Sequence, residues 1–535
     1  MQQTLSKWND ASTAKPVTGG VFLTTQPDVA PRPVLWGKVL DQDRCIGCHA
    51  CTVACKSENE VSMGVTRTFI KQVEIGMFPN VRRHFQVTRC NQCTDAPCVA
   101  ACPVTAMFRR PDGIVDFDRE VCIGCKACIA ACPYDAIFID PQTHSAEKCN
   151  FCAHRIDQGL QPACVAVCPE GAIIVGDMND PGSEISRILS RERVEVRKPH
   201  ARTNPKVFYK GGDVAALDPT RAEARPMFNT AEARRDGMPP PVPAAPAQNG
   251  IRSSAAAVIA YDDSHTLPWD WRVSLYTWTK SLSAGVFGLA AALSLATGRG
   301  ASLQGTAAAL SLLLLVATLG LIVADLEHPW RFYRILLRPQ PRSWLARGAF
   351  ILTGYALLLA LDLLGALIGS GSLQDALRAP GIVLGALAAA YTGFLFAQCR
   401  GRDLWQNPSL PVALIVQAAV AGSAGLLLLG AALPLPGPWA AALPPILVAA
   451  VAAHLLLVAS DAVVPAHTGD ALAAGRQLRR GVYAGWYWVG LLCGAVLPLV
   501  GALAGAAVPA AALALLGLFP YQHAYVQAGQ SVALS

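Results

Sequence analysis

Several familiar features are missing from this sequence of 535 residues. Its first 35 residues hold no apolar run longer than Val21-Phe22-Leu23, and the first arginine is Arg32. We therefore expect neither a cleaved secretory signal nor a twin-arginine export signal at this end. The net charge of +7 comes without a basic stripe or interleaved aromatics, which argues against nucleic-acid binding. The chain also lacks a nucleophile constellation and a glycine-rich dinucleotide loop, so we assign it no catalytic residue.

Cysteine and long apolar runs are each scarce in one half of the chain. Sixteen of the 18 cysteines lie between Cys45 and Cys168, whereas most long apolar runs follow residue 272. We therefore expect a soluble, cysteine-rich domain at 36–213 and a membrane domain at 268–535. A polar arm at 1–35 precedes the first domain, and an Ala- and Pro-rich linker at 214–267 joins the two.

The most informative stretch is the run Cys122-Ile-Gly-Cys-Lys-Ala-Cys-Ile-Ala-Ala-Cys132-Pro133. Gaps of two, two and three residues, closed by proline, are the bacterial iron–sulfur spacing. In that spacing three thiolates bind one cluster and the fourth reaches the neighbouring cluster. A disulfide framework or a zinc site would not need gaps this regular. The run therefore predicts iron–sulfur clusters.

Three further cysteine groups have related spacings. They are Cys45, Cys48, Cys51 and Cys55; Cys90, Cys93, Cys98 and Cys102; and Cys149, Cys152, Cys164 and Cys168. Taken alone, the last group is also compatible with a four-cysteine zinc site. With Cys122, Cys125, Cys128 and Cys132 the thiolates number sixteen, which suffices for four [4Fe–4S] clusters.

Short apolar segments between these groups predict small strands, at 114–117, 136–139 and 172–175. Such short strands leave little hydrophobic core. The clusters would therefore staple together an α+β, ferredoxin-like domain.

Two cluster motifs in tandem resemble a bacterial two-cluster ferredoxin, and here two such units are nested. This resemblance implies that the two middle groups share clusters and that the two outer groups do so as well. The implied ligand sets are Cys90, Cys93 and Cys98 with Cys132; Cys122, Cys125 and Cys128 with Cys102; Cys45, Cys48 and Cys51 with Cys168; and Cys149, Cys152 and Cys164 with Cys55. Residues 36–213 as a whole resemble the four-cluster electron-transfer subunits of molybdopterin oxidoreductases, such as dimethyl sulfoxide and polysulfide reductases.

The second half contains eight apolar stretches of about 20 residues, the length at which a helix spans a bilayer. They lie near 273–296, 303–325, 344–369, 379–399, 410–433, 439–460, 482–502 and 504–524. The last two are barely separated, which leaves a count of seven open. Eight spans place both ends of this half on one side of the membrane.

Arginine is divided unequally between the two sets of loops. The loops on the side of the two ends carry Arg331, Arg334, Arg338, Arg342, Arg347, Arg400, Arg402, Arg476, Arg479 and Arg480, and the opposite loops only Arg299 and Arg378. The positive-inside rule then favours a cytoplasmic position for the cysteine-rich domain, on a prokaryotic inner membrane. A reducing compartment also suits thiolate ligands. The alternative is that these arginines dock the cysteine-rich domain or bind a ligand.

Polar residues at membrane depth mark function by default. The candidates are Lys280, Asp325, Arg331, Arg347, Arg402, Asp403, His454 and Asp461. Asp362, in the middle of the third stretch, is a candidate for a proton path. Each candidate could also have a purely structural role. The arginines suit anchors to lipid headgroups, and Asp325 suits a helix cap or the partner of a nearby arginine. Cys399 and Cys493 suit packing.

Several short motifs in this half resemble the polysulfide-reductase (NrfD-like) membrane subunits. They are the run 325–334, Ser343-Trp344 with Arg347-Gly348, Gly401-Arg402-Asp403 with Trp405, and Gln527-Ala-Gly-Gln530. The resemblance implies an eight-helix bundle that binds a quinone without haem, with the polar candidates above as its site. Only His454 lies well inside an apolar stretch, whereas a b-haem in a bilayer usually needs two histidines.

These features lead to one hypothesis and two rivals. The chain is expected to pass electrons between the membrane quinone pool and a separate catalytic subunit that carries a molybdopterin or tungstopterin cofactor. One rival is a proton-translocating respiratory assembly with cytochrome partners. The other is a membrane-anchored redox sensor, although a sensor seldom needs four clusters.

Overall fold

A computed structural model of the chain describes residues 33–76, 79–224, 257–263, 267–298, 301–464 and 466–535. Met1–Pro33 and Val34–Ser535 form separate units, and the first lies outside the described residues except for Pro33. The arm expected at 1–35 therefore falls almost entirely outside the described residues.

The cysteine-rich part is built on two four-stranded sheets and two hairpins. The first sheet has the order β8-β1-β10-β9, from Ile173–Asp177, Trp36–Asp41, Val207–Lys210 and Val194–Glu195. The second has the order β11-β12-β2-β3, from Glu223–Ala224, Ala257–Tyr261, Thr68–Ile75 and Arg82–Arg89. The hairpins pair β4 (Met107–Arg109) with β5 (Val115–Phe117), and β6 (Ile137–Ile139) with β7 (Ala146–Lys148). Three strands, β5, β6 and β8, lie where the sequence predicts them.

Short helices carry the third cysteine of each group, and the fourth cysteine lies within the helix or just after its end. These helices are α1 (Ala50–Glu58), α2 (Pro97–Ala101), α3 (Ala127–Ala131) and α5 (Ala163–Ala166). Cysteines four residues apart project from one side of a helical turn, which suits the Cys-x3-Cys spacing. The remaining short helices of this part are α4 (Ala153–Ile156), α6 (Glu184–Arg191), α7 (Val214–Leu217), η2 (Pro199–Ala201) and η3 (Pro219–Arg221).

Part of the segment expected as a linker belongs to the second sheet instead. β12 pairs antiparallel with β2, and β11 pairs parallel with β12. The side chains of Ala257–Tyr261 alternate between buried and less buried, as in a strand with one face on a core. The linker expected at 214–267 therefore differs from the structure at 214–224 and 257–261, while 225–256 lies outside the described residues.

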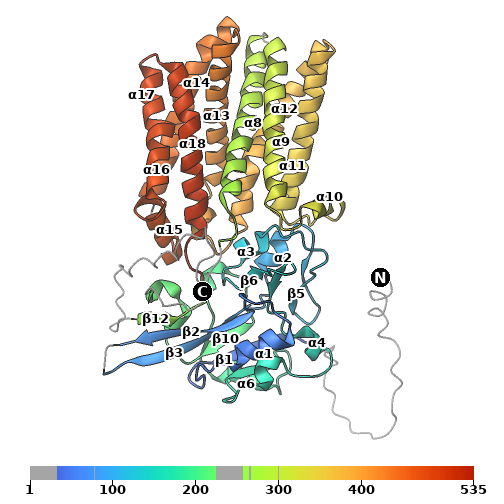
Figure 1. The fold of residues 1–535 in the computed structure, drawn as a ribbon, viewed down its shortest axis with the longest axis vertical. Coiled ribbons are helices and arrows are strands. Elements are labelled where there is room, and N and C mark those ends of the chain that lie inside the picture. Colours follow the sequence, from blue (N-terminus) through green and yellow to red (C-terminus); the bar gives the residue numbers. More distant parts are fainter. Residues whose placement is uncertain (1–32, 77–78, 225–256, 264–266, 299–300, 465) are drawn as a thin grey trace, which may run out of the picture. The chain divides into compact units, whose positions relative to one another are not determined.

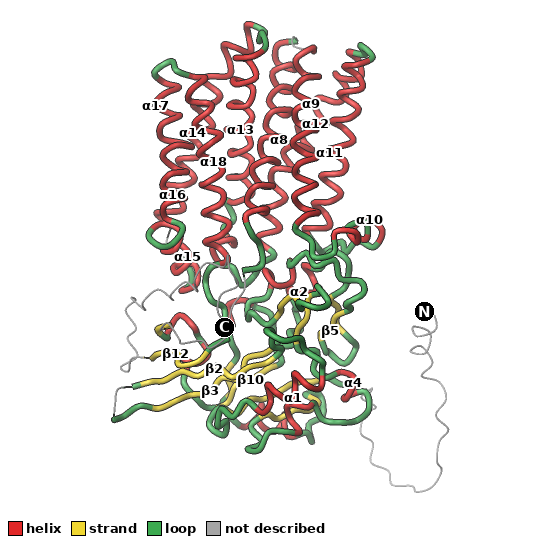
Figure 2. Tube along the Cα trace, in the orientation of Figure 1, coloured by secondary structure: helices red, strands yellow, loops and turns green. Residues whose placement is uncertain are grey.

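In the described residues the second half forms eight long helical rods, which run side by side in Figure 1 and are drawn red in Figure 2. They are α8 (Trp271–Thr297), α9 (Ala301–Ala324), α11 (Trp344–Leu367), α12 (Gly371–Ala397), α13 (Leu410–Ala432), α14 (Gly437–Val463), the continuous rod α16 (Ala484–Leu491)–η6 (Leu492–Val496)–α17 (Leu497–Leu503), and α18 (Ala507–Gln530). The first seven are long and apolar enough to cross a membrane. A turn at Gly505, whose φ is 85°, separates the last two rods, so the sequence estimate of about eight spans is confirmed.

The loops between the rods hold short helices and contact the cysteine-rich part. These helices are η4 (Pro329–Arg331), α10 (Arg334–Leu337), η5 (Asp403–Gln406) and α15 (Gly469–Arg479). Leu326 and Ile335 share one apolar core with Cys122 and Cys128. Trp269 and Trp405, whose ring centroids are 5.6 Å apart, share another core with the alanines of α2 and α3. The base of the bundle thus packs directly on cysteine-bearing helices.

Candidate metal centres and the adjoining polar site

Four cysteines from two groups line one cavity, which we call site IV. They are Cys102, Cys122, Cys125 and Cys128. Backbone N–H groups donate to their sulfurs, from Met107 to Cys102 at 3.5 Å and from Gly124 to Cys122 at 3.4 Å. This is one of the four sets that the ferredoxin resemblance implies.

A second cavity, site I, is lined by Cys45, Cys48, Cys51 and Cys168, another implied set. The backbone N–H of Ala172 donates to the sulfur of Cys168 at 3.3 Å. Cys48 is the one exposed cysteine among the sixteen, all of which lie in the described residues. Because Cys168 lies in site I, the four cysteines of the last group do not form a zinc site among themselves.

The other eight cysteines gather in two further places. Site II comprises Cys55, Cys149, Cys152 and Cys164, and site III comprises Cys90, Cys93, Cys98 and Cys132. In site II the Asn59 amide donates to the sulfurs of both Cys55 (3.7 Å) and Cys152 (3.6 Å). In site III burial, together with the neighbouring Cys90 and Cys132, raises the pKa of Cys93 to about 12. All four implied sets are therefore brought together.

The donor chemistry of these sites fits iron–sulfur clusters. All sixteen cysteines are free thiols. Burial raises the pKa of thiols such as Cys51 and Cys128, so their thiolates need a compensating cation. Four thiolates with N–H donors aimed at sulfur are the usual protein environment of a [4Fe–4S] cluster.

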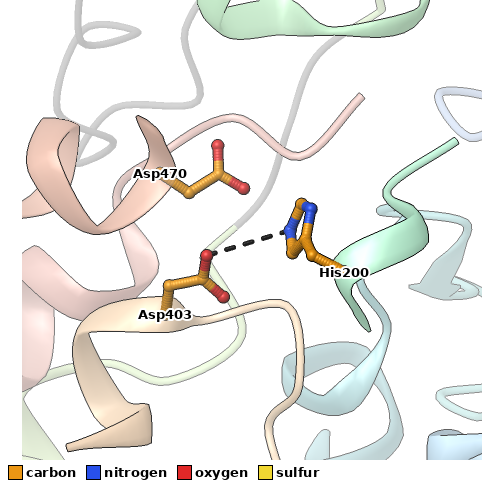
Figure 3. A group of neighbouring side chains, drawn as sticks. All are labelled: His200, Asp403 and Asp470. Carbon is orange, nitrogen blue, oxygen red and sulfur yellow. Dashed lines mark ion pairs between the residues drawn. The ribbon is translucent and has the colours of Figure 1, made fainter. Parts of the chain in front are cut away.

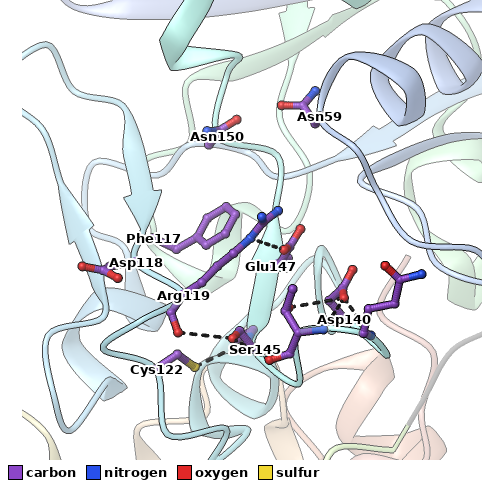
Figure 4. Close-up of polar contacts among 12 residues, drawn as sticks. Asn59, Phe117, Asp118, Arg119, Cys122, Asp140, Ser145, Glu147 and Asn150 are labelled. Atoms are coloured by element: carbon purple, nitrogen blue, oxygen red, sulfur yellow. Dashed lines mark hydrogen bonds and ion pairs between the residues drawn. The ribbon is translucent and has the colours of Figure 1, made fainter.

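A buried polar network runs between sites IV and II, and Figure 4 shows its part around Arg119, Glu147, Ser145 and Cys122. Glu147, which is fully buried, forms ion pairs with Arg67 at 2.9 Å and with Arg119 at 2.5 Å. Arg67 also donates to the side-chain oxygen of Asn59 at 2.9 Å. Near the other end, the N–H of Ala146 donates to Cys122 at 3.5 Å. The network thus fixes Asn59 against site II through charges that are themselves paired.

The loop after α9 contacts the cysteine run of site IV through ion pairs and hydrogen bonds. Lys126 forms ion pairs with Glu327 at 3.1 Å and with Asp325 at 3.6 Å. Arg331 donates to the carbonyl of Cys122 at 2.8 Å, and the Trp269 indole N–H donates to the carbonyl of Cys125 at 3.3 Å. Arg331 is therefore a docking residue here, which is the alternative that the sequence left open for the loop arginines.

A polar cluster lies in the bundle near this loop, and we call it the bundle polar cluster. It comprises Lys280, Tyr276, Tyr391, Thr392 and Asp325. Lys280 is 1% exposed, donates to Thr392 and to the carbonyl of Ala389 (3.3 Å), and lies 4.4 Å from the Tyr391 ring centroid. Tyr276, one turn earlier on α8, interacts with the side chain of Thr392 and with the charge of Asp325. Burial raises the pKa of Asp325 to about 6, while Lys126 opposes that shift. Tyr276 and Asp325 thus adjoin site IV, and Lys280 lies one turn of α8 further into the bundle.

The remaining candidates lie elsewhere. Arg347 donates to the carbonyl of Pro341 in its own loop, at 2.7 Å. Arg402 donates to the carbonyls of Gln530 (2.9 Å) and Val532 (3.0 Å) near the end of the chain. His454 packs edge-on against Tyr521, with centroids 4.8 Å apart, and Asp461 accepts from Asn407 at 2.7 Å. The structure therefore divides the eight candidates among several places.

Asp403 lies in a group of polar side chains at the contact between the two halves, shown in Figure 3. It accepts a hydrogen bond from Thr468 and lies 3.9 Å from His200. Asp470, the third residue of the group, forms a 2.6 Å ion pair with Lys198. Although the three ligand atoms lie within 4.8 Å of one another, Lys198 already neutralises one carboxylate, so these residues join the two halves.

Another buried polar group lies near the end of the bundle that faces away from the cysteine sites. Asp362 is fully buried and accepts from Gln304 at 2.9 Å. The Arg378 guanidinium donates to the other end of the same amide at 2.7 Å. Asp362 therefore lies near the end of α11 and not in the middle of its span as expected, and its neighbours come from α9 and α12.

Sequence reasoning missed Tyr276, Tyr391, Thr392 and Trp269. Tyr276 precedes Lys280 by four residues, which places both on one face of a helix. That spacing is a usable signal. No spacing in the sequence predicts that Tyr391 and Thr392 of α12 lie against Lys280 of α8.

Comparison with protein families covers both halves of the sequence. Residues 260–533 match the family described as polysulphide reductase, NrfD. Residues 81–178 match a 4Fe-4S dicluster domain, and residues 36–57 match a 4Fe-4S binding domain.

Individual relatives align with the cysteine-rich half. A tetrathionate reductase subunit of Salmonella typhimurium is 44% identical over 197 residues, which cover 36% of this chain and 79% of the relative. A polysulfide reductase subunit of Wolinella succinogenes is 42% identical over 176 residues, covering 32% and 92%. The arsenate respiratory reductase iron-sulfur subunit ArrB of a Shewanella species is 34% identical over 221 residues, covering 32% and 94%.

Proposed function

The protein belongs to the polysulphide reductase NrfD family and carries a 4Fe-4S electron-transfer subunit of the reductase type before its membrane subunit, and from this premise we propose that it passes electrons between a catalytic oxidoreductase subunit and membrane quinone. Sites I to IV would hold four [4Fe–4S] clusters, each of which, when bound, accepts or donates one electron at a time.

The contact between site IV and the bundle carries this proposal. The carbonyl of Cys125 accepts from Trp269 immediately before α8, and Lys126 pairs with Asp325 immediately after α9. A quinone held at the bundle polar cluster would lie against the site from which its electrons come. Lys280 and the hydroxyls of Tyr276 and Tyr391 suit a quinone oxygen, and Asp325 suits proton exchange at that oxygen.

The opposite end of the series of sites suits a catalytic partner. Cys48 of site I is exposed, and apolar side chains beside site I are exposed as well, namely Ile46 (55%) and Val53 (67%). Exposed apolar side chains around a redox site are typical of an interaction surface. The relatives bear the names of tetrathionate, polysulfide and arsenate reductase subunits, which supports a catalytic reductase subunit as the partner. The molybdopterin or tungstopterin cofactor of that partner is proposed from the sequence resemblance alone.

We propose a cytoplasmic position for the cysteine-rich half, on the basis of the arginine-rich loops. These loops lie on the same side as the sites, as the contacts of Arg331 and Arg400 with the cysteine-rich part indicate. These two arginines would therefore have two roles. They favour a cytoplasmic loop, and they hold the cysteine-rich half against the bundle.

The quinone proposal is tested on the purified native complex. Lys280→Met and Tyr391→Phe should each lower quinone-linked turnover by about tenfold, or about 1.4 kcal/mol in the transition state. Dye-linked turnover of the catalytic subunit should persist, because the dye takes its electrons before the bundle. Ser423→Ala is the control, since that hydroxyl bonds only carbonyls of its own helix among the described residues. Unchanged quinone turnover in both variants would refute the quinone site.

The iron count tests the rest of the proposal. We expect about sixteen irons per chain, four for each set of four thiolates. Cys125→Ser should abolish or alter one electron paramagnetic resonance signal and interrupt transfer to quinone. A native complex with far fewer irons would contradict four clusters.

The buried group at Asp362 favours a second candidate function, proton translocation across the bundle. A carboxyl buried inside the bundle near one of its ends, beside Gln304 and Arg378, is a costly arrangement that suits a proton relay. In proteoliposomes, Asp362→Asn should retain quinone-linked electron transfer while abolishing the coupled pH change that a lumenal dye reports. An identical pH change in the variant would exclude this role.

A further inference from the structure

Arg89 is a buried cation between two of the cysteine sites. It ends β3, opposite Thr68 of β2, and is 2% exposed. Its Nη1 donates to the sulfur of Cys164 in site II at 3.2 Å. Cys51 of site I packs in the same apolar core as Cys164. The guanidinium also acts on both sites electrostatically, because it lowers the pKa of Cys51 and Cys55 against the upward effect of burial.

Protein groups leave this side chain partly unsatisfied. Nε and Nη2 of Arg89 have no hydrogen-bond partner among the described residues, and no ion pair with a carboxylate is found for it there. A buried guanidinium with unpaired N–H groups and no counter-anion is unfavourable. Its surroundings therefore call for negatively charged acceptors, and the nearest candidates are sulfurs.

Two other donors reach site II but not site I. Lys38, which is 1% exposed, lies 3.9 Å from the Cys164 sulfur and 3.9 Å from the Phe151 ring centroid. The Asn59 amide reaches Cys55 and Cys152, as described above. Site II thus receives a second cation, Lys38, and an amide donor in addition to Arg89.

We propose that Arg89 sets the reduction potentials of the clusters in sites I and II, holding both above the values that they would have beside a neutral side chain. The inference rests on the proposed function, since it requires clusters in both sites. Reduction adds one electron and no proton, so a fixed positive charge nearby favours the reduced form, most strongly where the dielectric is low. The electron comes from the catalytic partner or the quinol and leaves to the other. Cluster sulfides would also supply the acceptors that Nε and Nη2 lack.

Redox titration of the native complex, followed by electron paramagnetic resonance with dithionite as reductant, tests this role. Arg89→Met should move two of the four signals to lower potential by at least a tenfold change in the ratio of reduced to oxidised form, which is 59 mV for one electron. Lys38→Met should move only one of these two signals. Lys71→Met is the control, because it removes a buried lysine that pairs with Asp262, and should move none.

The outcomes separate this inference from the proposed function. If the unaltered complex lacks its irons, the proposed function fails. If four signals are present but Arg89→Met leaves every midpoint unchanged, the role of Arg89 is overturned. Should Arg89→Met lose iron, Arg89→Gln decides, since it removes the charge but keeps a side-chain N–H donor. A lower midpoint in the same two signals then supports the role, and unchanged midpoints exclude it.

Discussion

At the scale of single residues, two glycines let the backbones of the two halves meet. A Cβ at Gly401 would lie 2.5 Å from Cα of Pro133, the residue after Cys132 of site III. A Cβ at Gly124 would lie 2.3 Å from Cβ of Glu327, and Gly124 has a φ of 69°. Neither neighbour is the end of a flexible side chain, so the contacts have little room to adjust.

Gly401→Ala should therefore weaken the docking of the bundle on site III. Overpacking of this kind costs about 1–3 kcal/mol. The variant should keep its iron but melt at a lower temperature in detergent and lose quinone-linked turnover. Gly371→Ala serves as the control, because its Cβ would meet nothing within 4 Å. A melting temperature equal to that of the control would show that the contact carries no strain.

The sequence predicts residues unevenly at this scale. Spacing predicts the four cysteine groups because a cluster imposes geometry on its ligands. How the groups combine into sets is what the ferredoxin resemblance implies, and the structure gathers the sixteen thiols in those sets. Membrane depth alone does not predict contacts. Lys280 and Asp325 lie by Tyr276, whereas His454 packs on Tyr521 far along the chain.

At the scale of elements, small residues decide how closely the rods approach. Gly285 of α8 faces Gly422 of α13, and a Cβ on Gly285 would lie 1.9 Å from the carbonyl oxygen of Ala418. Gly494 in the π-helical turn η6 meets Gly517 of α18 in the same way. Close backbone approach through small residues is a common basis of helix association in membranes.

Gly285→Ala should push α8 away from α13 and destabilise the bundle by about 1–3 kcal/mol. Thermal melting in detergent and the yield of monodisperse protein both report this loss. Gly288→Ala, on the same helix three residues later, has no neighbour within 4 Å of its Cβ and should behave like the unaltered protein. Equal losses in the two variants would point to a general sensitivity of α8 instead.

Elements were predictable where one physical signal dominates. Hydropathy locates the long helices, and apolar runs of three or four residues locate β5, β6 and β8. β12 was missed because its five residues lie in an Ala- and Pro-rich stretch, and only pairing with β2 makes them a strand. Local amino-acid composition does not predict tertiary pairing of this kind.

At the scale of the whole molecule, the two halves depend differently on iron. The apolar cores of the cysteine-rich half include Cys51, Cys164 and the cysteines of site IV, whereas the main core of the bundle consists of apolar side chains. Burying four thiols side by side without metal leaves that half poorly supported.

Protein made in iron-starved cells should therefore show a protease-sensitive cysteine-rich half and a resistant bundle. Mass spectrometry after limited proteolysis should find cuts between residues 34 and 224 and few between 271 and 530. Iron-replete protein is the control. Equal resistance in both preparations would mean that the sheets alone support the domain.

The pairing of β12 with β2 has a kinetic consequence. Ala257–Tyr261 is fastened to the sheet, and Trp269, eight residues later, is hydrogen-bonded to Cys125 just before the first rod begins. The electron-carrying half is thus tied at two points and is not a swinging carrier on a free tether. If the protein works as proposed, electrons would cross a fixed gap by tunnelling, and the rate of that crossing should not depend on solvent viscosity.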